Sequence, residues 1–208
     1  MESMLGVRAH WEQVYAEKDP REVSWFEPTP ERSLSLIEAT GVGRDAAILD
    51  VGGGASSLGA QLLEAGYTDV TVADLAASAL KHAQAQLGDE AARITWLEAD
   101  IRDHDFGRLY DLWHDRAVFH FMVDPGDREG YLAVLRRTLR PGGHLLLATF
   151  GPEGPTQCSG LPVVRYGSGD LSRALDQGFE LLSSSLQEHI TPAGNPQQFH
   201  YARLIRAA

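Results

Sequence analysis

The sequence predicts an α/β fold of the doubly wound type, in which a parallel sheet carries helices on both faces. Apolar, strand-like segments alternate with helix-like segments through the middle of the chain. A glycine turn at residues 52–54 joins the first strand of this series to the first helix. Together, the alternation and the turn predict a ligand site at the carboxyl ends of the strands.

Each element is expected from its local pattern. Residues 6–18 predict a helix that Asp19-Pro20 ends, and Thr29-Pro30-Glu31 begins a second helix. Strands are expected near 46–51, 69–74, 93–98, 109–114 and 143–149, with intervening helices near 57–65, 76–87 and 127–139, then a helix over Leu171 to Asp176 and two last strands over 179–188 and 199–205.

A chain of 208 residues is long enough for one α/β domain with a full core. We expect one domain over 1–208, with an N-terminal helical lid (1–44), a cofactor-binding core (45–150) and a substrate loop with a C-terminal hairpin (151–208). Residues 151–168 are rich in Gly, Pro and Ser. Their length predicts either a substrate-facing loop or a mobile excursion.

Composition restricts the partners and the compartment. The formal charge of −11 argues against nucleic acid, because phosphate binding depends on basic patches. A single cysteine excludes an intrachain disulfide, and no apolar run follows a basic start. The expectation is a cytoplasmic protein without a membrane partner, whose oligomeric state stays open.

The glycine turn is defined by what it lacks. No lysine follows it, as a phosphate-binding P-loop would require, and Ser57 stands where a dinucleotide fingerprint needs its third glycine. Asp50 lies two residues before Gly52, and a carboxylate beside a pyrophosphate would cost Coulomb energy. The turn therefore suits a ligand without phosphates.

Two further acids end the next two predicted strands. Asp74 lies at the separation at which such folds place an acid on ribose hydroxyls, and Asp100 follows the third strand. Carboxylates at three successive strand ends favour a ligand that carries an adenosine and positive charge. S-adenosylmethionine, with its sulfonium and amino group, fits this description.

Five ordered motifs carry a resemblance to a known family. They are Ile48–Gly54, Val72–Leu75, Leu97–Asp100, Tyr110–Asp115 and Leu139–Leu145. In this order and spacing they resemble class I, seven-strand S-adenosylmethionine-dependent methyltransferases over roughly residues 45 to 150. The resemblance implies a seven-stranded Rossmann-like sheet whose last strand is antiparallel. The stretches His10-Trp11 to Trp25-Phe26-Glu27 and 52–57 are similar to a branch that includes some lysine methyltransferases.

The donor site is expected along the strand ends, with Leu75 as a wall for adenine. The aromatic residues of the N-terminal segment either pack it onto the domain or form a lid that contacts the cofactor. The predicted S-adenosylmethionine contacts are Asp50, Gly52, Gly54, Ser56, Asp74, Leu75, Asp100, Ile101 and Asp115, with Trp25 and Tyr15 from the lid. No metal site is predicted.

Methyl transfer from a sulfonium is an in-line displacement, so the acceptor must lie within about 3 to 3.5 Å of the methyl group. Asp115, at the end of the fourth strand, is predicted to orient an acceptor or accept its proton; the alternatives are a cap or a salt bridge with Arg116. His120 is the candidate base, although a histidine between two phenylalanines also suits packing.

The predicted function is S-adenosylmethionine-dependent methyl transfer to a small-molecule or protein nucleophile, through N, O or S. Two other functions stay open. One is a catalytically silent module that binds the same cofactor and contacts a protein partner. The other is a nicotinamide-dependent oxidoreductase, which Asp50 and Ser57 disfavour.

Overall fold

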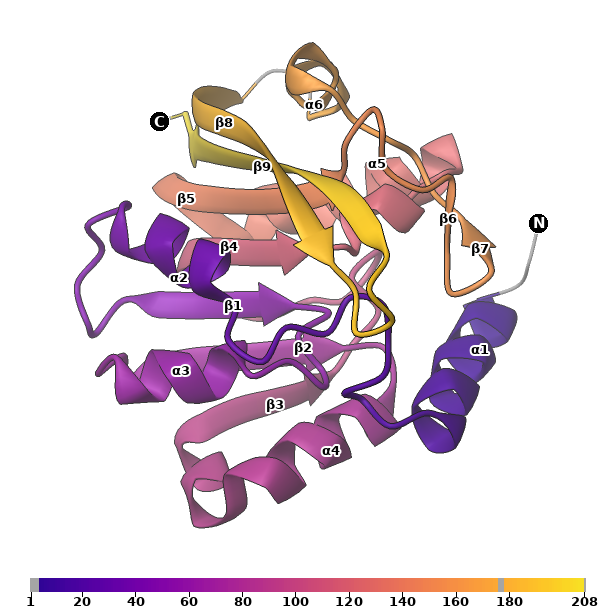
Figure 1. Ribbon diagram of the computed structural model, residues 1–208. Coiled ribbons are helices and arrows are strands. Elements are labelled where there is room, and N and C mark those ends of the chain that lie inside the picture. The colour runs from indigo at the N-terminus through magenta and orange to yellow at the C-terminus, as the bar shows by residue number, and fades with distance from the viewer. Residues whose placement is uncertain (1–3, 176–177, 208) are drawn as a thin grey trace.

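The computed structural model describes residues 4–175 and 178–207, which form a seven-stranded sheet in the order β3-β2-β1-β4-β5-β9-β8 (Figure 1). Its strands are β1 (Ala47–Val51), β2 (Asp69–Asp74), β3 (Ile94–Glu98), β4 (Tyr110–Arg116), β5 (Leu139–Phe150), β8 (Phe179–Ile190) and β9 (Pro196–Arg206). Strands β1 to β5 pair in parallel, and β9 runs antiparallel to both β5 and β8. The predicted Rossmann-like sheet is confirmed.

Helices cover both faces of the sheet, as predicted (Figure 1). They are α1 (Met4–Glu17), α2 (Glu31–Glu38), α3 (Leu58–Glu64), α4 (Ala77–Leu87), α5 (Pro125–Thr138) and α6 (Ser168–Ala174), with short 3-10 turns η1 (Gly88–Arg93) and η2 (Phe119–Phe121). The apolar residues of α2, α3 and α4 share one core with the sheet, and those of α5 and α6 share the other. The prediction for the last helix extended to Asp176, which lies outside the described residues.

Two predicted boundaries differ from the structure. Helix α5 begins at Pro125 because the side chain of Asp124 accepts a hydrogen bond from Gly126 N and caps the first turn. The helix ends at Thr138, because Leu139 is extended and already pairs with Tyr110 on β4. Strand β5 is therefore longer than the glycine-containing sequence around residues 141–143 suggested.

The alternating side chains of β1 explain the two cores. Leu49 and Val51 belong to the α5 side, whereas Ile48 points to the side of α2 and α3. All five residues of β1 are buried, as a strand between two helical layers requires. The strand that precedes the glycine turn is thus fixed from both sides.

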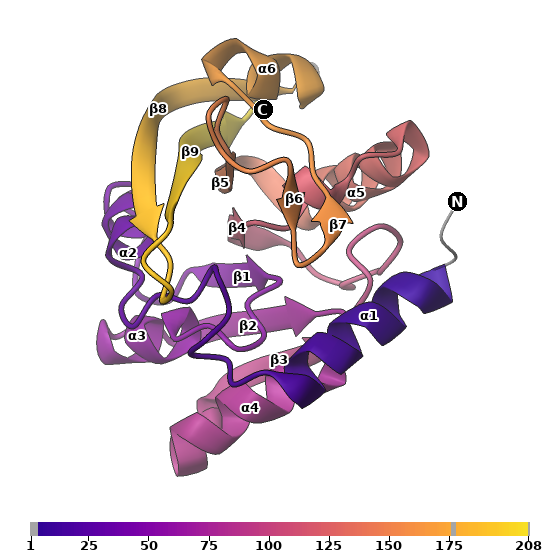
Figure 2. The same ribbon diagram turned by 45° about the vertical axis from the view of Figure 1, so that its right-hand side comes forward.

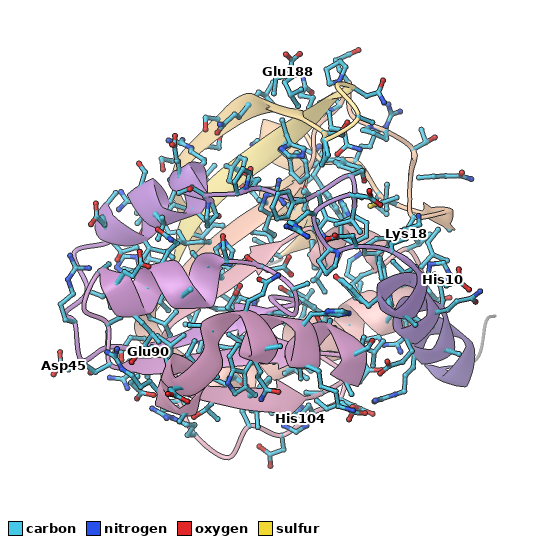
Figure 3. The ribbon with its side chains drawn as sticks, turned by 60° about the horizontal axis from the view of Figure 1, so that its bottom comes forward. His10, Lys18, Asp45, Glu90, His104 and Glu188 are labelled. Atoms are coloured by element: carbon cyan, nitrogen blue, oxygen red, sulfur yellow. The ribbon has the colours of Figure 1, made fainter. Side chains whose placement is uncertain are left out.

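Two segments project beyond the carboxyl ends of the strands. Residues 151–168 contain a small hairpin, β6 (Gln157–Cys158) and β7 (Leu161–Pro162), and α1 crosses the same end of the sheet from the other side (Figure 2). Helix α1, which carries His10 and ends just before Lys18, lies beside α4 (Figure 3). The side chain of Glu12 on α1 accepts a hydrogen bond from Ala77 N at the start of α4. Within the described residues, no helix has both the length and the apolar character needed to cross a membrane.

Candidate methyl-donor cleft

A cleft of about 810 Å³ opens at the carboxyl ends of β1, β2 and β4. Its walls come from strand ends, α1, η2 and the β6–β7 hairpin. Its lining includes Trp11, Tyr15, Trp25, Gly52, Asp74, Leu75, Asp100, Ile101, Arg102, Arg116, Val118, Phe121, Cys158, Leu161 and Pro162. The cleft therefore combines the predicted donor residues with side chains of the predicted lid.

Glycine is required twice in the turn that follows β1. Gly52 has a φ of +67°, and a Cβ there would lie 2.1 Å from Val118 Cγ2. A Cβ at Gly53 would lie 2.1 Å from Asp50 Oδ2. The turn thus brings bare backbone to the cleft at Gly52 and leaves Asp50 room beneath it.

Asp74 joins the end of β2 to this turn. Its Oδ2 accepts a hydrogen bond from Gly54 N at 3.1 Å, and its Oδ1 accepts one from Ala76 N at 2.8 Å. Burial raises the pKa of Asp74 to about 6, although these backbone donors oppose the shift. Each oxygen has capacity for a further hydrogen bond, and Asp74 and its neighbour Leu75 both line the cleft.

Asp100 is held in place by an arginine. Arg102 Nη2 lies 2.6 Å from Asp100 Oδ2, and Arg102 Nη1 lies 3.1 Å from Asp127 Oδ2. Burial would raise the pKa of Asp100, but the hydrogen bonds from Arg102 outweigh it and the pKa falls. Asp100 is therefore an ionised wall of the cleft beside Ile101.

A second cavity, of about 50 Å³, lies between the glycine turn and the N-terminal segment. Asp50, Ser56 and Arg116 are among its lining residues, and Trp25 and Tyr15 line both cavities. Asp50 is only 2 % exposed, and its Oδ2 has no hydrogen-bond partner among the described residues. A buried carboxylate oxygen in this state is suited to a cationic or hydrogen-bonding ligand.

Aromatic rings close the cleft on the α1 side. The ring of Trp11 lies edge-on to Phe121 and Trp25, with centroids 5.2 and 5.8 Å apart, and Tyr15 is 6.3 Å from Trp25. Tyr15 and Trp25 were predicted as the lid. Trp11 and Phe121 were not singled out as cleft residues, because alternation and helical periodicity mark them only as apolar.

Asp115 does not reach the cleft, in contrast to its predicted contact with donor and acceptor. It is fully buried, accepts hydrogen bonds from Val118 N at 2.9 Å and Phe119 N at 3.1 Å, and accepts one from the Tyr131 hydroxyl at 2.6 Å. Asp115 therefore caps the start of η2, which is one of the two structural roles that the sequence left open. The salt bridge with Arg116 is not formed, because Arg116 Nη2 faces Glu27 at 3.1 Å.

His120 does not line the cleft either. It is fully buried; Phe150 N donates to its Nδ1 at 3.3 Å, and burial lowers its pKa to about 3. Phe121, its neighbour, is the residue that lines the cleft. The His120 ring packs against Phe150, with ring centroids 4.7 Å apart, so the structure does not place it as a base in contact with an acceptor.

Gly54 and Ser56 have structural partners as well as their predicted role. Gly54 supplies its N–H to Asp74, and Ser56 Oγ accepts a hydrogen bond from Leu58 N at 3.1 Å at the start of α3. Their contact with a cofactor stays a prediction. Within the described chain, no group of three His, Cys, Asp or Glu side chains could hold a metal ion.

Sequence reasoning missed the cleft role of Arg116. Its Nη1 donates to Trp25 O at 2.9 Å, its Nε donates to Tyr201 OH at 3.1 Å, and its guanidinium lies 4.5 Å from the Phe199 ring centroid. Because it lines both cavities, it places a fixed positive charge between them. The sequence offered one signal: Arg116 follows His114 by two residues on β4, so the two side chains lie on the same face of the strand.

Comparison with known proteins agrees with the fold. Residues 48–143 match a family model described as a methyltransferase domain. Malonyl-[acyl-carrier protein] O-methyltransferase of Anoxybacillus flavithermus is 35% identical over 106 residues, which are 50% of this chain and 39% of that protein. EEF1A lysine methyltransferase 2 of Danio rerio is 27% identical over 162 residues, or 71% of this chain and 70% of that one. Residues 48–143, just under half of the chain, thus resemble a methyltransferase domain, in agreement with the five sequence motifs.

Solved structures extend the comparison to the whole methyltransferase fold. The N-methyltransferase NodS of Bradyrhizobium japonicum, in complex with S-adenosylhomocysteine, superimposes with a TM-score of 0.73 at 20% identity, covering 97% of this chain and 98% of that chain. The likeness at this identity concerns the fold. It confirms the predicted class I methyltransferase architecture from α1 to the terminal hairpin.

Proposed function

We propose that the chain binds S-adenosylmethionine in the large cleft and transfers its methyl group to an acceptor held against the aromatic wall. The observation that carries this proposal is the mixed lining of the cleft. It combines the carboxylates of Asp74 and Asp100 with the apolar side chains of Trp11, Phe121 and Leu161. The bound cofactor would supply an electrophilic methyl group on a sulfonium, and the chain supplies orientation.

The residues present fit this cofactor. Asp74 has the lone pairs to accept both ribose hydroxyls, and Leu75 and Ile101 offer apolar cover for adenine. The smaller cavity has two acids, Asp50 and Glu27, and one cation, Arg116, which is paired with Glu27 at 3.1 Å. Asp50 and Arg116 complement an ammonium and a carboxylate, the two charged groups of an amino-acid tail. A diphosphate in the same place would face Asp50 and Asp74.

Among the described residues, the four carboxylates that line the cleft each have a hydrogen-bond or ion-pair partner: Asp74 and Asp100 as described, Asp124 with Gly126 N, and Asp127 with Arg102. We propose that none of them acts as the base for an acceptor. In the part of the chain that the structure describes, no histidine lines the cleft. Burial raises the pKa of the Cys158 thiol to about 11, so this group stays protonated at neutral pH and does not take up a proton from an acceptor.

An acceptor must therefore arrive with its lone pair free. We propose a small molecule with an apolar body that presents a thiolate, a heteroaromatic nitrogen or a neutral amine, in preference to an alcohol. Trp11, Phe121, Leu161 and Pro162 would contact the body of such a molecule. The chain's own contribution to the chemistry is alignment and exclusion of water.

A protein lysine is the second candidate. Two features favour it: the similarity to EEF1A lysine methyltransferase 2, and the rings of Trp11 and Phe121, which can attract an amine cation. Under this candidate, the side chain would enter past the β6–β7 hairpin. The reaction would again depend on solvent to remove the ammonium proton.

The test uses S-adenosylmethionine with a labelled methyl group. The protein is incubated with thiophenol, quinoline, benzylamine and benzyl alcohol separately, and with a cell lysate. Label on the first three, and not on benzyl alcohol, supports the small-molecule proposal. Label on lysine of one lysate protein supports the second candidate. A melting temperature raised by S-adenosylhomocysteine, with no transfer to any acceptor, favours a silent module, and one raised only by NAD contradicts the proposal.

A further inference from the structure

Three buried side chains form a hydrogen-bonded line from α2 to the glycine turn. His114 Nδ1 lies 2.7 Å from Asp50 Oδ1, and His114 Nε2 lies 2.9 Å from Ser33 Oγ. The exposed fractions are 2 % for Asp50, 5 % for His114 and 1 % for Ser33. All three residues line the smaller cavity.

The sheet register explains how the line forms. Asp50 on β1 and His114 on β4 are direct partners across parallel strands, so their side chains lie on the same face. That face is the one covered by α2, on which Ser33 is buried together with Leu36 and Ile37. The arrangement thus follows from the fold, and it connects the N-terminal segment to Asp50, two residues before the glycine turn.

The hydrogen bonds give each imidazole nitrogen one partner. A carboxylate oxygen accepts, so His114 donates Nδ1–H to Asp50, while Nε2 pairs with the Ser33 hydroxyl, which can donate or accept. This arrangement occupies Oδ1 and leaves Oδ2 unpartnered. Oδ2 is the atom that a Cβ at Gly53 would meet, so it lies beneath the turn. Asp50 therefore has one oxygen anchored and one free.

We propose that Ser33 and His114 are positioning residues that hold Asp50 for the cationic end of the donor's amino-acid tail. The inference rests on the proposed function, since it needs S-adenosylmethionine or its product in the cleft. Arg116, on the same face of β4, supplies the opposite charge, and Glu27 lies 3.1 Å from it. Without the His114 donor, the Asp50 carboxylate would be free to turn toward Arg116 and away from the ligand.

The experiment compares two ligands that differ only at this end of the molecule. S-adenosylhomocysteine has the amino-acid tail, whereas 5′-methylthioadenosine has the same adenosine and thioether without it. Dissociation constants are measured by calorimetry for the wild type and for His114→Leu, His114→Asn and Ser33→Ala. Asparagine can place an N–H where the imidazole has Nδ1–H, so it is the conservative replacement.

We expect His114→Leu to weaken S-adenosylhomocysteine about tenfold or more, because a hydrogen bond to a charged group is lost. His114→Asn should recover most of this loss, Ser33→Ala should show a smaller loss, and 5′-methylthioadenosine should bind all four proteins alike. Equal losses for the two ligands would mean that His114 only supports the fold, which overturns the inference. So would a His114→Asn protein as weak as His114→Leu. A wild type that binds neither ligand would instead overturn the proposed function.

Discussion

The carboxylate of Asp74 accepts a hydrogen bond from Gly54 N at 3.1 Å, which ties the end of β2 to the glycine turn after β1. The two parts of the predicted donor site are therefore one unit. Twenty residues separate them in the chain, and the parallel pairing of β1 with β2 brings them together. The same carboxylate is buried enough for its ionisation to depend on pH near neutrality.

Asp74 makes donor binding sensitive to pH. Because burial raises its pKa to about 6, the carboxylate is protonated below that value and loses its ability to accept two ribose hydroxyls. S-adenosylhomocysteine affinity should fall by up to about tenfold per pH unit below this pKa, as one proton must be lost on binding. Asp74→Asn should bind weakly at every pH between 5 and 8. Asp103→Asn, an exposed change of equal charge, is the control, and a wild-type affinity that is flat from pH 5 to 8 would contradict the assignment.

Substitution of Gly52 shows how much the turn depends on a positive φ and how much on the absence of a side chain. Alanine at Gly52 must adopt a φ of +67° and would lie 2.1 Å from Val118 Cγ2, whereas Gly41 has a φ of +76° with nothing within 4 Å. Gly41→Ala should therefore cost about 1 kcal/mol of unfolding free energy, from the backbone alone. Gly52→Ala should cost more and should weaken cofactor binding.

The double variant Gly52→Ala, Val118→Ala separates the two effects. Removing the valine methyl groups relieves the clash but not the positive φ, so stability should recover only in part. Urea denaturation of the four proteins gives the comparison. If Gly52→Ala costs no more than Gly41→Ala, the predicted steric contact with Val118 has no energetic weight.

Asp115 and Tyr131 form a buried hydrogen-bonded pair, and its contribution to the free energy of unfolding should depend on pH. Tyr131→Phe removes the hydroxyl that lies 2.6 Å from Asp115 Oδ2 and also leaves Trp113 Nε1 without its partner, at a cost of about 1–3 kcal/mol. Burial raises the pKa of Asp115 to about 6, so this group favours folding less as pH rises from about 4 to 6.

The cost of Tyr131→Phe should consequently be larger at pH 7, where Asp115 is ionised, than at pH 4. Tyr110→Phe is the matched control, because the hydroxyl of Tyr110 is equally buried but donates to a neutral group, Thr71 Oγ1, at 3.2 Å. Its cost should be the same at both pH values. Equal pH dependence in the two variants would mean that Asp115 is not the cause.

Asp50 and Asp74 line the two cavities, as the sequence predicted, whereas Asp115 and His120 are buried away from both. Asp50 and Asp74 lie at the carboxyl ends of strands with mainly apolar sequences, and the fold rule that puts ligands at such ends applies directly to them. Asp115 ends a strand as well, but its partner Tyr131 comes from α5, sixteen residues later. Whether a strand-end acid faces the cleft or a helix behind it depends on packing that no local pattern records.

The sequence predicted which residues form the lid but not the contact that attaches α1 to the domain. The aromatic content of residues 11–26 indicated a segment over the site, and Tyr15 and Trp25 do line the cleft. Its anchor was not visible, because Glu12 acts on an element more than sixty residues away. The signal was indirect: α4 begins after Ala76, which has no side chain to cap a helix.

Glu12 supplies that missing cap and so holds α1 over the cleft. Its Oε1 accepts a hydrogen bond from Ala77 N at 2.6 Å and its Oε2 accepts one from Ser78 N at 3.2 Å. Burial opposes ionisation of Glu12, but the hydrogen bonds from Ser78 and Ala77 outweigh it and lower the pKa. A lowered carboxyl pKa means that this cap stabilises the protein fully above pH 4.5 and is lost as the pH falls through the folded-state pKa.

Glu12→Ala should therefore speed hydrogen exchange at the amides of Ala77 and Ser78 and destabilise the fold by about 0.5–2 kcal/mol at pH 7, the usual cost of a lost cap. It should also raise the dissociation rate of S-adenosylhomocysteine, since α1 carries Trp11 and Tyr15 at the mouth of the cleft. Glu17→Ala removes an exposed acid from the same helix, whose contact is with Gln13 on α1 itself, and should leave all three quantities unchanged. If the two variants release the ligand at the same rate, α1 does not act as a lid through Glu12.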